Sequence, residues 1–211
     1  MLDVEQGSDE WKAARAGRLC ASRAADMMAM LKNGGESAAR RDLRLQLVTE
    51  RITNQPQDDQ FVNADMRRGT ELEPDARALY EAQTDTLVRL TGFLAHTELL
   101  CGVSLDGHIG DFEGVLELKV PRPATHIRYL RAGVLPAEHR YQVTHQLFVT
   151  GAAWCDFVSY CPALPEGGKL FRVRVERDNY EIQQYELALR FFLGEVDKEA
   201  ETVLALVKAV A

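Results

Sequence analysis

The sequence predicts an α/β protein in which a mixed β-sheet has helices on both of its sides. Helical spacing of apolar residues comes first along the chain, a meander of strand patterns follows, and helices and two more strands come after it. The 211 residues are 46% hydrophobic and 27% charged, which suits one sizeable core. We therefore expect a single domain over residues 1–211.

Serine residues mark the expected starts of three N-terminal helices. A serine hydroxyl accepts a hydrogen bond from the first turn of a helix, and glycine commonly ends one. The expected helices run from Ser8 to Gly17, from Ser22 to the break at Asn33-Gly34-Gly35, and from about Ser37 to Asn54.

The rest of the chain carries both strand and helix patterns. Asn63 to Gly69 is expected to be a polar loop before a helix from about Thr70 to Gln83, with Pro74 in the first turn of that helix. Strands are expected at Thr86–Leu90, Phe93–Leu105 with a bend, Val115–Val120, Trp154–Tyr160 and Leu170–Glu176. Further helices are expected near Thr125–Arg131, at about Glu138–Thr150 and from Asn179 to the end.

The formal net charge of −7 argues at first sight against a nucleic-acid partner. A local basic lining or bound metal ions, however, set the field that a phosphate meets, so net charge is a weak guide to a site. Arginines gather in three stretches, although a run of charge is more often a solvated face. These stretches contain Arg40, Arg41, Arg44 and Arg51; Arg67 and Arg68; and Arg122, Arg128 and Arg131.

Neither a membrane span nor a signal peptide is expected. No run approaches the roughly 18 apolar residues of a spanning helix, and the first residues lack the basic, apolar and small-residue succession of a signal peptide. The four cysteines lie within or beside apolar stretches without a Cys-x-x-Cys pair, which favours buried free thiols over disulfides or zinc. We expect a cytoplasmic protein.

Two acids and a lysine lie where two expected strands adjoin. Asp106 ends an apolar run, and a glycine-rich turn separates it from Glu117 and Lys119. Side chains alternate along a strand, so Glu117 and Lys119 share one face while Leu118 points into the core. A hairpin would bring Asp106 back over Glu117.

Magnesium chemistry would use this set of residues. Mg²⁺ prefers six oxygen ligands and usually takes one or two protein carboxylates, which leaves positions for water and phosphate oxygens. Asp106 and Glu117 would supply carboxylates, and the backbone carbonyl of Leu118 a further oxygen. Lys119 would stabilise the charge that develops during phosphoryl transfer. An Asp near a turn followed by Glu-x-Lys is also common on solvated sheet edges, so these residues alone leave both interpretations open.

Other residues suit the same chemistry or a simpler role. Glu73 would project toward the hairpin as a third acid, or form an ordinary ion pair with Arg77 one turn later. Gln142 and Gln146 share a helix face, which is either solvated or near a phosphate. An arginine with two hydroxyls is a sound set of donors for a terminal phosphate. The residues of that set are Arg15, Ser22 and Ser104.

Five blocks of sequence together resemble the lambda exonuclease group of phage-type recombination nucleases. This group is also called the YqaJ family, within the PD-(D/E)XK restriction-endonuclease-like superfamily. The resemblance covers nearly the whole chain, with the blocks in the right order. They are Glu5-Gln6-Gly7-Ser8-Asp9-Glu10-Trp11 leading to Arg15-x-Gly17 and Ala21-Ser22; Gly69-Thr70-Glu71-Leu72-Glu73-Pro74-Asp75-Ala76-Arg77; Ser104-Leu105-Asp106-Gly107; Leu116-Glu117-Leu118-Lys119-Val120-Pro121; and Tyr141-Gln142-Val143-x-x-Gln146.

The resemblance implies a restriction-endonuclease-like core and a role for each residue of the hairpin. Asp106 and Glu117 match the metal-binding acids, and the carbonyl of Leu118 matches the backbone ligand. Lys119 matches the catalytic lysine, and Glu73 matches the acid from the preceding helix. The implied cofactor is Mg²⁺ in a two-ion site, with Mn²⁺ as a substitute.

The resemblance also implies how DNA is held. Arg15, Ser22, Ser104 and Gln142 match residues that bind the 5′-terminal phosphate. Met66 falls where the family has an apolar wedge that parts the terminal base pairs, at a cost in unstacking energy.

Two positions depart from the family pattern. The proline before the first acid is Leu105 in this sequence, and Arg68 stands beside the wedge position where an aromatic residue is expected. Neither change removes a metal ligand. The departures therefore concern the handling of DNA more than the chemistry.

The implied function is hydrolysis of linear double-stranded DNA from its 5′ ends. A magnesium-dependent, processive exonuclease of this kind releases 5′-mononucleotides and leaves 3′ single strands for DNA recombination in a phage or prophage. The implied assembly is a toroidal homotrimer, whose hole arginines would line, and the implied partner is a single-strand-annealing recombinase.

Three alternatives remain from the sequence. One is another PD-(D/E)XK endonuclease. Another is an Fe–S nuclease, which is disfavoured because only Cys155 and Cys161 lie close together among the cysteines. The third is a DNA-binding oligomer without catalysis. The intact set of two acids and a lysine argues against it.

Overall fold

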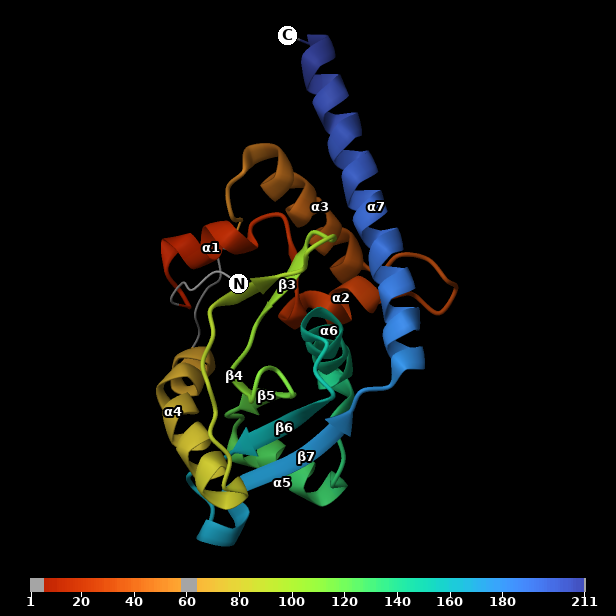
Figure 1. Ribbon diagram of the computed structural model, residues 1–211. Coiled ribbons are helices and arrows are strands. Elements are labelled where there is room, and N and C mark those ends of the chain that lie inside the picture. Colours follow the sequence, from red (N-terminus) through yellow and green to blue (C-terminus); the bar gives the residue numbers. More distant parts are fainter. Residues whose placement is uncertain (1–5, 58–63, 211) are drawn as a thin grey trace. The chain divides into compact units, whose positions relative to one another are not determined.

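The computed structural model describes residues 6–57 and 64–210, apart from the side chains of Met66 and Val210. The chain forms two compact units, each built from segments far apart in sequence (Figure 1). The terminal unit contains Met1–Asp59, Gly92–Ser104 and Asp178–Ala211, and the central unit contains Gln60–Thr91 and Leu105–Arg177. The prediction of one domain stays a prediction.

The terminal unit combines four helices with a small mixed sheet among its described residues. The strand order is β1-β3-β2, in which β1 runs parallel and β2 antiparallel to β3. The strands are β1 (Leu19–Cys20), β2 (Phe93–Ala95) and β3 (Cys101–Ser104). The helices are α1 (Asp9–Arg15), α2 (Ala24–Met28), α3 (Ala38–Thr53) and α7 (Asn179–Val210), with a 3₁₀ turn η1 (Ala21–Arg23) before α2.

Helix α3 packs against α7 through an apolar stripe with ion pairs beside it. Leu43, Leu47 and Val48 of α3 are buried. Arg40 pairs with Glu195 at 2.5 Å, and its Nε donates to a backbone carbonyl of α2 at 3.1 Å. Arg44 and Arg51 pair in the same way with acids of α7. Three of the four arginines of the first stretch are therefore used inside the terminal unit.

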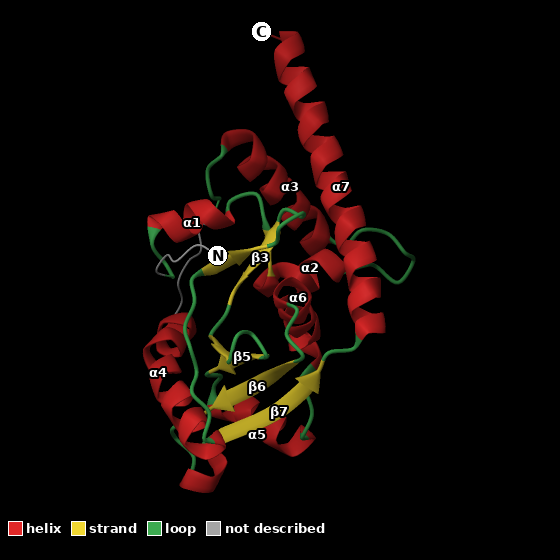
Figure 2. Ribbon diagram, in the orientation of Figure 1, coloured by secondary structure: helices red, strands yellow, loops and turns green. Residues whose placement is uncertain are grey.

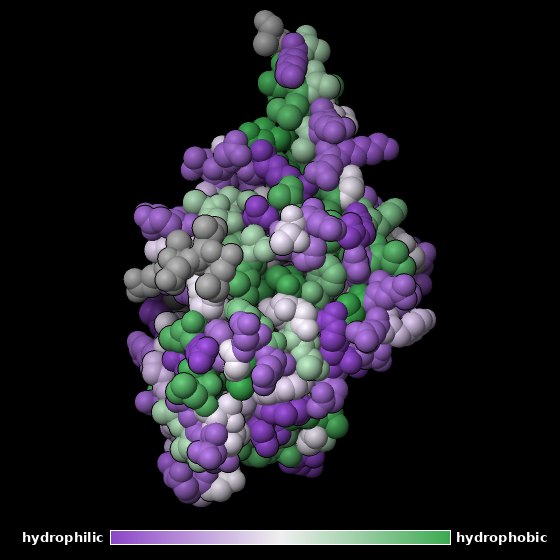
Figure 3. Space-filling model, in the orientation of Figure 1, coloured by the Kyte–Doolittle hydropathy of each residue, from purple (hydrophilic) through white to green (hydrophobic). Residues whose placement is uncertain are grey.

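Helix α7 is longer than the core that it covers. Its earlier turns bury an apolar stripe that includes Leu189, Phe192 and Val196. Leu204 and Leu206 in the last turns are exposed, and Figure 3 shows apolar side chains on that end of the helix. The C-terminal turns therefore contribute little to the core of this unit.

The central unit is a four-stranded mixed sheet with helices on both faces (Figure 2). The order is β4-β5-β6-β7, with antiparallel outer pairs and a parallel central pair. The strands are β4 (Gly107–Ile109), β5 (Gly114–Lys119), β6 (Trp154–Tyr160) and β7 (Leu170–Glu176). The helices are α4 (Ala64–Thr84), α5 (Pro123–Ala132) and α6 (Arg140–Thr150), with 3₁₀ turns η2 (Ala137–His139) and η3 (Glu166–Gly168).

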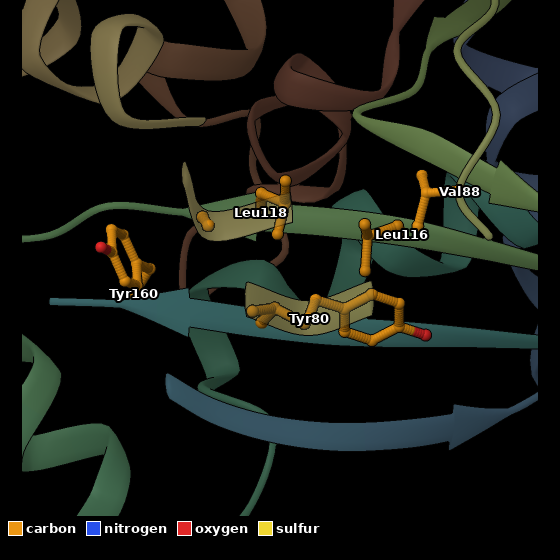
Figure 4. Close-up of a cluster of buried hydrophobic side chains, with 7 residues drawn as sticks. Tyr80, Val88, Leu116, Leu118 and Tyr160 are labelled. Atoms are coloured by element: carbon orange, nitrogen blue, oxygen red, sulfur yellow. The ribbon is translucent and has the colours of Figure 1, made fainter. Parts of the chain in front are cut away.

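Helix α4 covers one face of this sheet. Tyr80 packs with Leu116, Leu118, Val158 and Tyr160 in a buried cluster (Figure 4). The tyrosine hydroxyl donates to buried Asp156 at 2.8 Å, so its polar end is satisfied within the core. This packing fixes which face of β5 is apolar.

Helices α5 and α6 cover the opposite face. Tyr129 of α5 packs with Phe157 and Phe171 of the sheet. His126 lies between Ser159 Oγ at 2.7 Å and the Gly168 carbonyl at 2.9 Å, which ties α5 to β6 and to η3. Glu117 lies on this face of β5, because side chains alternate along a strand.

The predicted α/β class with mixed pairing and helices on both sides is confirmed, although the strands form two sheets rather than one. Ser8 and Ser37 are N-caps that accept hydrogen bonds from Trp11 and Arg40 amides at 3.1 and 3.2 Å. All four cysteines are buried and free, as predicted. No helix in the described part of the chain is long and apolar enough to cross a bilayer.

Three predictions about helix starts were wrong. Ser22 lies in a 3₁₀ turn and caps no helix, and α2 ends at Met28. Within the expected loop Asn63–Gly69, α4 already begins at Ala64, which leaves Pro74 in the helix interior rather than the first turn. Contacts of the early turns of α4 with the segment after β5 stabilise this extra length. Local sequence signals do not report such contacts.

Two predicted strands also differ from the structure. Thr86–Leu90 forms only an isolated bridge between Arg89 and His108, because β4 offers three residues for pairing. Phe93–Leu105 is a hairpin of β2 and β3 rather than one bent strand. The remaining predicted strands lie within one residue of the observed ones.

Replacing Gly114 with alanine is expected to lower the free energy of unfolding by about 1–3 kcal/mol, because overpacking is costly. A methyl group at Gly114 would lie 2.3 Å from the ring of Trp154, its partner in β6. Urea unfolding followed by circular dichroism measures the change. Gly194→Ala is the control, since a methyl group there enters open space on α7. Equal stability of the two variants would contradict the packing.

Candidate active site

Asp106 is positioned at the start of the β4–β5 hairpin. Gly107 is paired with Leu116, so the antiparallel strands carry Asp106 back alongside the end of β5. The Leu118 amide donates to Asp106 Oδ2 at 2.6 Å. A hairpin is present as predicted, but its first strand is Gly107–Ile109, which the sequence placed in the turn, and the Asp106 side chain continues the ladder just before β4 begins.

The carbonyl of Leu118 faces the same edge of β5. The N–H and C=O groups of one strand residue point toward the same neighbouring strand. Because β4 begins at Gly107, its described ladder with β5 does not extend to Leu118. The Leu118 carbonyl is therefore directed toward the end of the hairpin where Asp106 lies.

Glu117 is a buried carboxylate with three donors. Its side chain is 2% exposed, and Lys119 forms an ion pair with it on the same face of β5. Gln142 Nε2 donates to Oε1 at 2.6 Å, and Gln146 Nε2 donates to Oε2. Both glutamines come from one face of α6, as their spacing predicts. The two oxygens are thus held by two amides and an ammonium group.

Glu73 approaches from helix α4. Its Oε1 accepts a hydrogen bond from Arg77 Nη2 at 2.7 Å, so the ion pair predicted as the simpler alternative is present. Glu73 also lines the same cleft as Asp106 and Glu117. Burial raises the pKa of Asp106 well above its usual value, with further contributions from the charges of Glu117 and Glu73. The three acids therefore repel one another electrostatically.

These residues line a cleft of about 460 Å³ in the central unit. Burial alone would lower the pKa of Lys119, but Glu117 and Asp106 outweigh it and raise that pKa. Lys119 is consequently a cation at neutral pH. The full lining is Asp65, Gly69, Glu73, Asp106, Glu117, Leu118, Lys119, Val120, Pro121, Tyr129, His139 and Gln142.

Tyr129 and His139 are cleft residues that the sequence did not point to. The Tyr129 hydroxyl donates to Glu138 at 3.0 Å and lies 3.3 Å from His139 Nε2. The His139 ring stacks on Phe157 with centroids 5.0 Å apart. Burial and the nearby Lys119 lower the pKa of His139. Lone aromatic residues without a spacing pattern give no signal in a single sequence.

The donors in the cleft suit a hard divalent cation. Carboxylate and carbonyl oxygens are the ligands that Mg²⁺ prefers, and the repulsion among the acids is of the kind that a cation relieves. Within residues 6–57 and 64–210, no three His, Cys, Asp or Glu side chains are already grouped to hold a metal ion. The Glu117 carboxylate would have to exchange protein donors for a cation.

The predicted phosphate-binding residues are divided between the two units. In the terminal unit, Trp11 Nε1 donates to Ser104 Oγ at 2.8 Å, and the Arg15 guanidinium stacks 3.8 Å over the Trp11 ring. Trp11 thus brings Arg15 and Ser104 together. Ser22 is exposed in the turn after β1. Gln142 belongs to the central unit, where it donates one of its two amide hydrogens to Glu117.

The turn that carries Arg15 depends on glycine. Gly17 has φ of +70°, and a Cβ there would lie 2.8 Å from Arg51 Cγ. The Gly17 amide donates to buried Glu50 at 2.7 Å, and its carbonyl accepts from Arg51 at 3.0 Å. This explains the Arg15-x-Gly17 motif. Met66 lies in the first turn of α4, and its side chain is outside the described part of the chain.

Solved structures place this fold among exonucleases. An alkaline exonuclease from Laribacter hongkongensis, LHK-Exo, is 38% identical with a TM-score of 0.87, covering 97% of this chain and 100% of that chain. LHK-Exo in complex with dAMP gives the same TM-score at 37% identity over 97% of this chain and 100% of that chain. A phage-related exonuclease from Haemophilus somnus 129PT shares the fold at 10% identity and a TM-score of 0.66, covering 88% and 96% of the two chains.

Residues 10–153 match the model of the YqaJ-like viral recombinase domain. The match spans more than half of the sequence, so the chain belongs to the YqaJ-like viral recombinase family. This confirms the resemblance carried by the sequence motifs. A search of curated proteins found no match.

Replacing Gln146 with leucine is expected to lower the free energy of unfolding by about 1–3 kcal/mol, because a buried carboxylate oxygen loses its donor. Gln146 is 1% exposed, so water does not replace the amide readily. Guanidinium unfolding measures the loss.

The matched control is Gln183→Leu on the exposed face of α7, expected to stay within about 0.5 kcal/mol of the parent. A Gln146→Leu protein as stable as that control would show that Glu117 does not need this donor.

Proposed function

We propose that this protein is a magnesium-dependent, processive 5′→3′ exonuclease acting on linear double-stranded DNA. The observation that carries the proposal is the β4–β5 hairpin, which presents Asp106, Glu117 and Lys119 in one cleft. Family membership and the fold shared with exonucleases support the same conclusion. The products are 5′-mononucleotides and a 3′ single strand for recombination, in the cytoplasm of a phage or prophage host.

In the proposed reaction, water adds to the phosphorus between the first two nucleotides and the 3′ oxygen of the first nucleotide leaves. Each cut therefore creates a new 5′-phosphate end. Asp106, Glu117 and the Leu118 carbonyl would hold Mg²⁺, with Glu73 as a further acid at a two-ion site and Mn²⁺ as a substitute. Bound ions of this kind activate water and neutralise charge on the phosphate.

Lys119 supplies the protein's own positive charge at the reacting phosphate. Its ammonium group pairs with Glu117 beside the proposed metal site, and in this proposal it acts as an electrostatic stabiliser of the phosphate charge. Gln142 and Gln146 hold Glu117 in place through their amides. A cation bound by Glu117 would replace some of these donors.

The direction of digestion follows from binding of the 5′-terminal phosphate. In this proposal Arg15, Ser22, Ser104 and Gln142 hold that phosphate, and Met66 parts the terminal base pairs. The contact of Trp11 with both Arg15 and Ser104 supports a shared role for those two residues.

The proposed assembly is a toroidal homotrimer that threads DNA. Encircling the product would give processivity without sequence-specific contacts, since phosphate contacts position DNA but do not specify its sequence. A single-strand-annealing recombinase that takes up the 3′ strand is the proposed partner.

End-labelled linear duplex with magnesium tests the function. We expect digestion from 5′ ends with release of mononucleotides, and no cutting of a closed circle. Cutting of the circle would favour the alternative of a PD-(D/E)XK endonuclease, and degradation from 3′ ends would exclude the proposed polarity. DNA binding without cleavage at any Mg²⁺ or Mn²⁺ concentration would favour a non-catalytic oligomer.

In the same assay, Lys119→Ala and Asp106→Ala should lower turnover by about 100-fold or more, because the first removes positive charge at the phosphate and the second removes a ligand of the proposed metal ions. Lys169→Ala and Asp111→Ala remove the same charges at a half-buried and an exposed position, neither of which lines the cleft. These two controls should retain activity. Parental rates in both cleft variants would refute the mechanism.

Arg15→Ala should selectively remove the preference for 5′-phosphorylated over 5′-hydroxyl ends. The guanidinium is a fork of donors suited to a phosphate, and alanine leaves none. Initial rates on the two end types give the preference. Lys12→Ala on the same helix is the control and should keep it. Equal slowing of both end types by Arg15→Ala would mean that Arg15 does not read the phosphate.

A further inference from the structure

Arg68 of α4 makes two hydrogen bonds to the chain that follows the catalytic lysine. Its Nη2 donates to the Val120 carbonyl at 2.8 Å and to the Pro121 carbonyl at 2.6 Å. One nitrogen therefore bridges two consecutive backbone acceptors. Arg68 occupies the position beside the wedge at which the family pattern led us to expect an aromatic residue.

The segment from Val120 to Arg122 lies between β5 and α5, so the regular hydrogen bonds of these two elements do not reach the carbonyls of Val120 and Pro121. The ladder between β5 and β6 ends at the pair of Lys119 and Ser159. Helix α5 begins at Pro123, and its first turn uses the Arg122 carbonyl, which accepts bonds from two α5 amides at 3.0 and 3.1 Å. The carbonyls of Val120 and Pro121 fall between the strand and the helix. Arg68 supplies the donor that neither element provides.

The same segment forms part of the cleft. Val120 and Pro121 line it directly after Lys119, and Asp65 and Gly69 line it from the first turns of α4. Arg68 lies between these two α4 residues in sequence and holds the two walls together. A shift of the segment would also move the end of β5 that carries Lys119.

A second link joins the same two walls but is weaker. Asp65 pairs with Arg122 at 2.9 Å, and the two side chains are 51% and 74% exposed. Exposed ion pairs of this kind contribute little. The Arg68 bridge is half-buried and has a charged donor, so it is the stronger of the two links.

We propose that Arg68 is a positioning residue that fixes Lys119 and couples the first turns of α4 to the cutting centre. This inference rests on the proposed exonuclease function. The backbone of Met66 lies two residues earlier in the same helix. Arg68 therefore connects the helix that carries the predicted wedge to the strand that carries the catalytic lysine.

Arg68→Met tests the proposal, because it keeps an unbranched apolar stem and removes the donors. We expect kcat on 5′-phosphorylated duplex to fall by about 10-fold to 100-fold through misplacement of Lys119. KM should change by less than about two-fold, since DNA binding is retained. Arg68→Lys, which still offers donors on a shorter stem, should recover part of the kcat.

Arg131→Met is the matched control for charge. It removes one exposed arginine charge from α5 in the same unit, without touching the bridge. We expect parental kcat for this control. A raised KM with parental kcat in Arg68→Met would overturn the proposal and make Arg68 a contact for the DNA backbone.

Hydrogen exchange provides a measurement that does not depend on activity. Peptides covering residues 117–126 should exchange faster in Arg68→Met than in the parent and in Arg131→Met, at equal melting temperature. If Arg68→Met does not fold, kcat and hydrogen exchange are both measured on Arg68→Lys instead. Unchanged exchange and unchanged kcat would refute the bridge. An inactive parent would refute the proposed nuclease function, while faster exchange would still support the bridge.

Discussion

The burial of Glu117 is the constraint on which the central unit depends. A carboxylate removed from water is costly unless it is paired and hydrogen-bonded. Lys119 on the same strand and the two glutamines of α6 meet that requirement, so α6 must lie across this face of the sheet. The apolar side chains next to Glu117 in β5 then face α4. One charged residue thereby determines which helix covers which face.

The distribution of charge has a second consequence. Arg40, Arg44 and Arg51 looked available for a phosphate backbone, yet each is paired with an acid of α7. These three arginines therefore contribute to the packing of α3 on α7. In the proposed function, Lys119 and bound cations would provide the positive field where the phosphate reacts, and Arg15 would provide it at the 5′ end.

Residues whose partners are near in sequence were predictable, and those with distant partners were not. The N-caps at Ser8 and Ser37 and the alternation of side chains along β5 follow from local rules, and the structure agrees with them. The extra length of α4 depends on carbonyls more than fifty residues away. Tyr129 and His139 reach the cleft only because α5 and η2 pack on the sheet. No periodicity in the sequence could predict the extra length of α4 or the place of these two residues in the cleft.

The serine predicted to bind the terminal phosphate lies two residues before the acid predicted to bind the metal. Ser104 ends β3 in the terminal unit, and Asp106 precedes β4 in the central unit, with buried Leu105 between them. Covalent geometry limits the separation of Cα atoms two residues apart to about 7 Å. In the proposed function, the residue assigned to the terminal phosphate and the residue assigned to the metal are therefore close neighbours along the chain, whatever the arrangement of the two units.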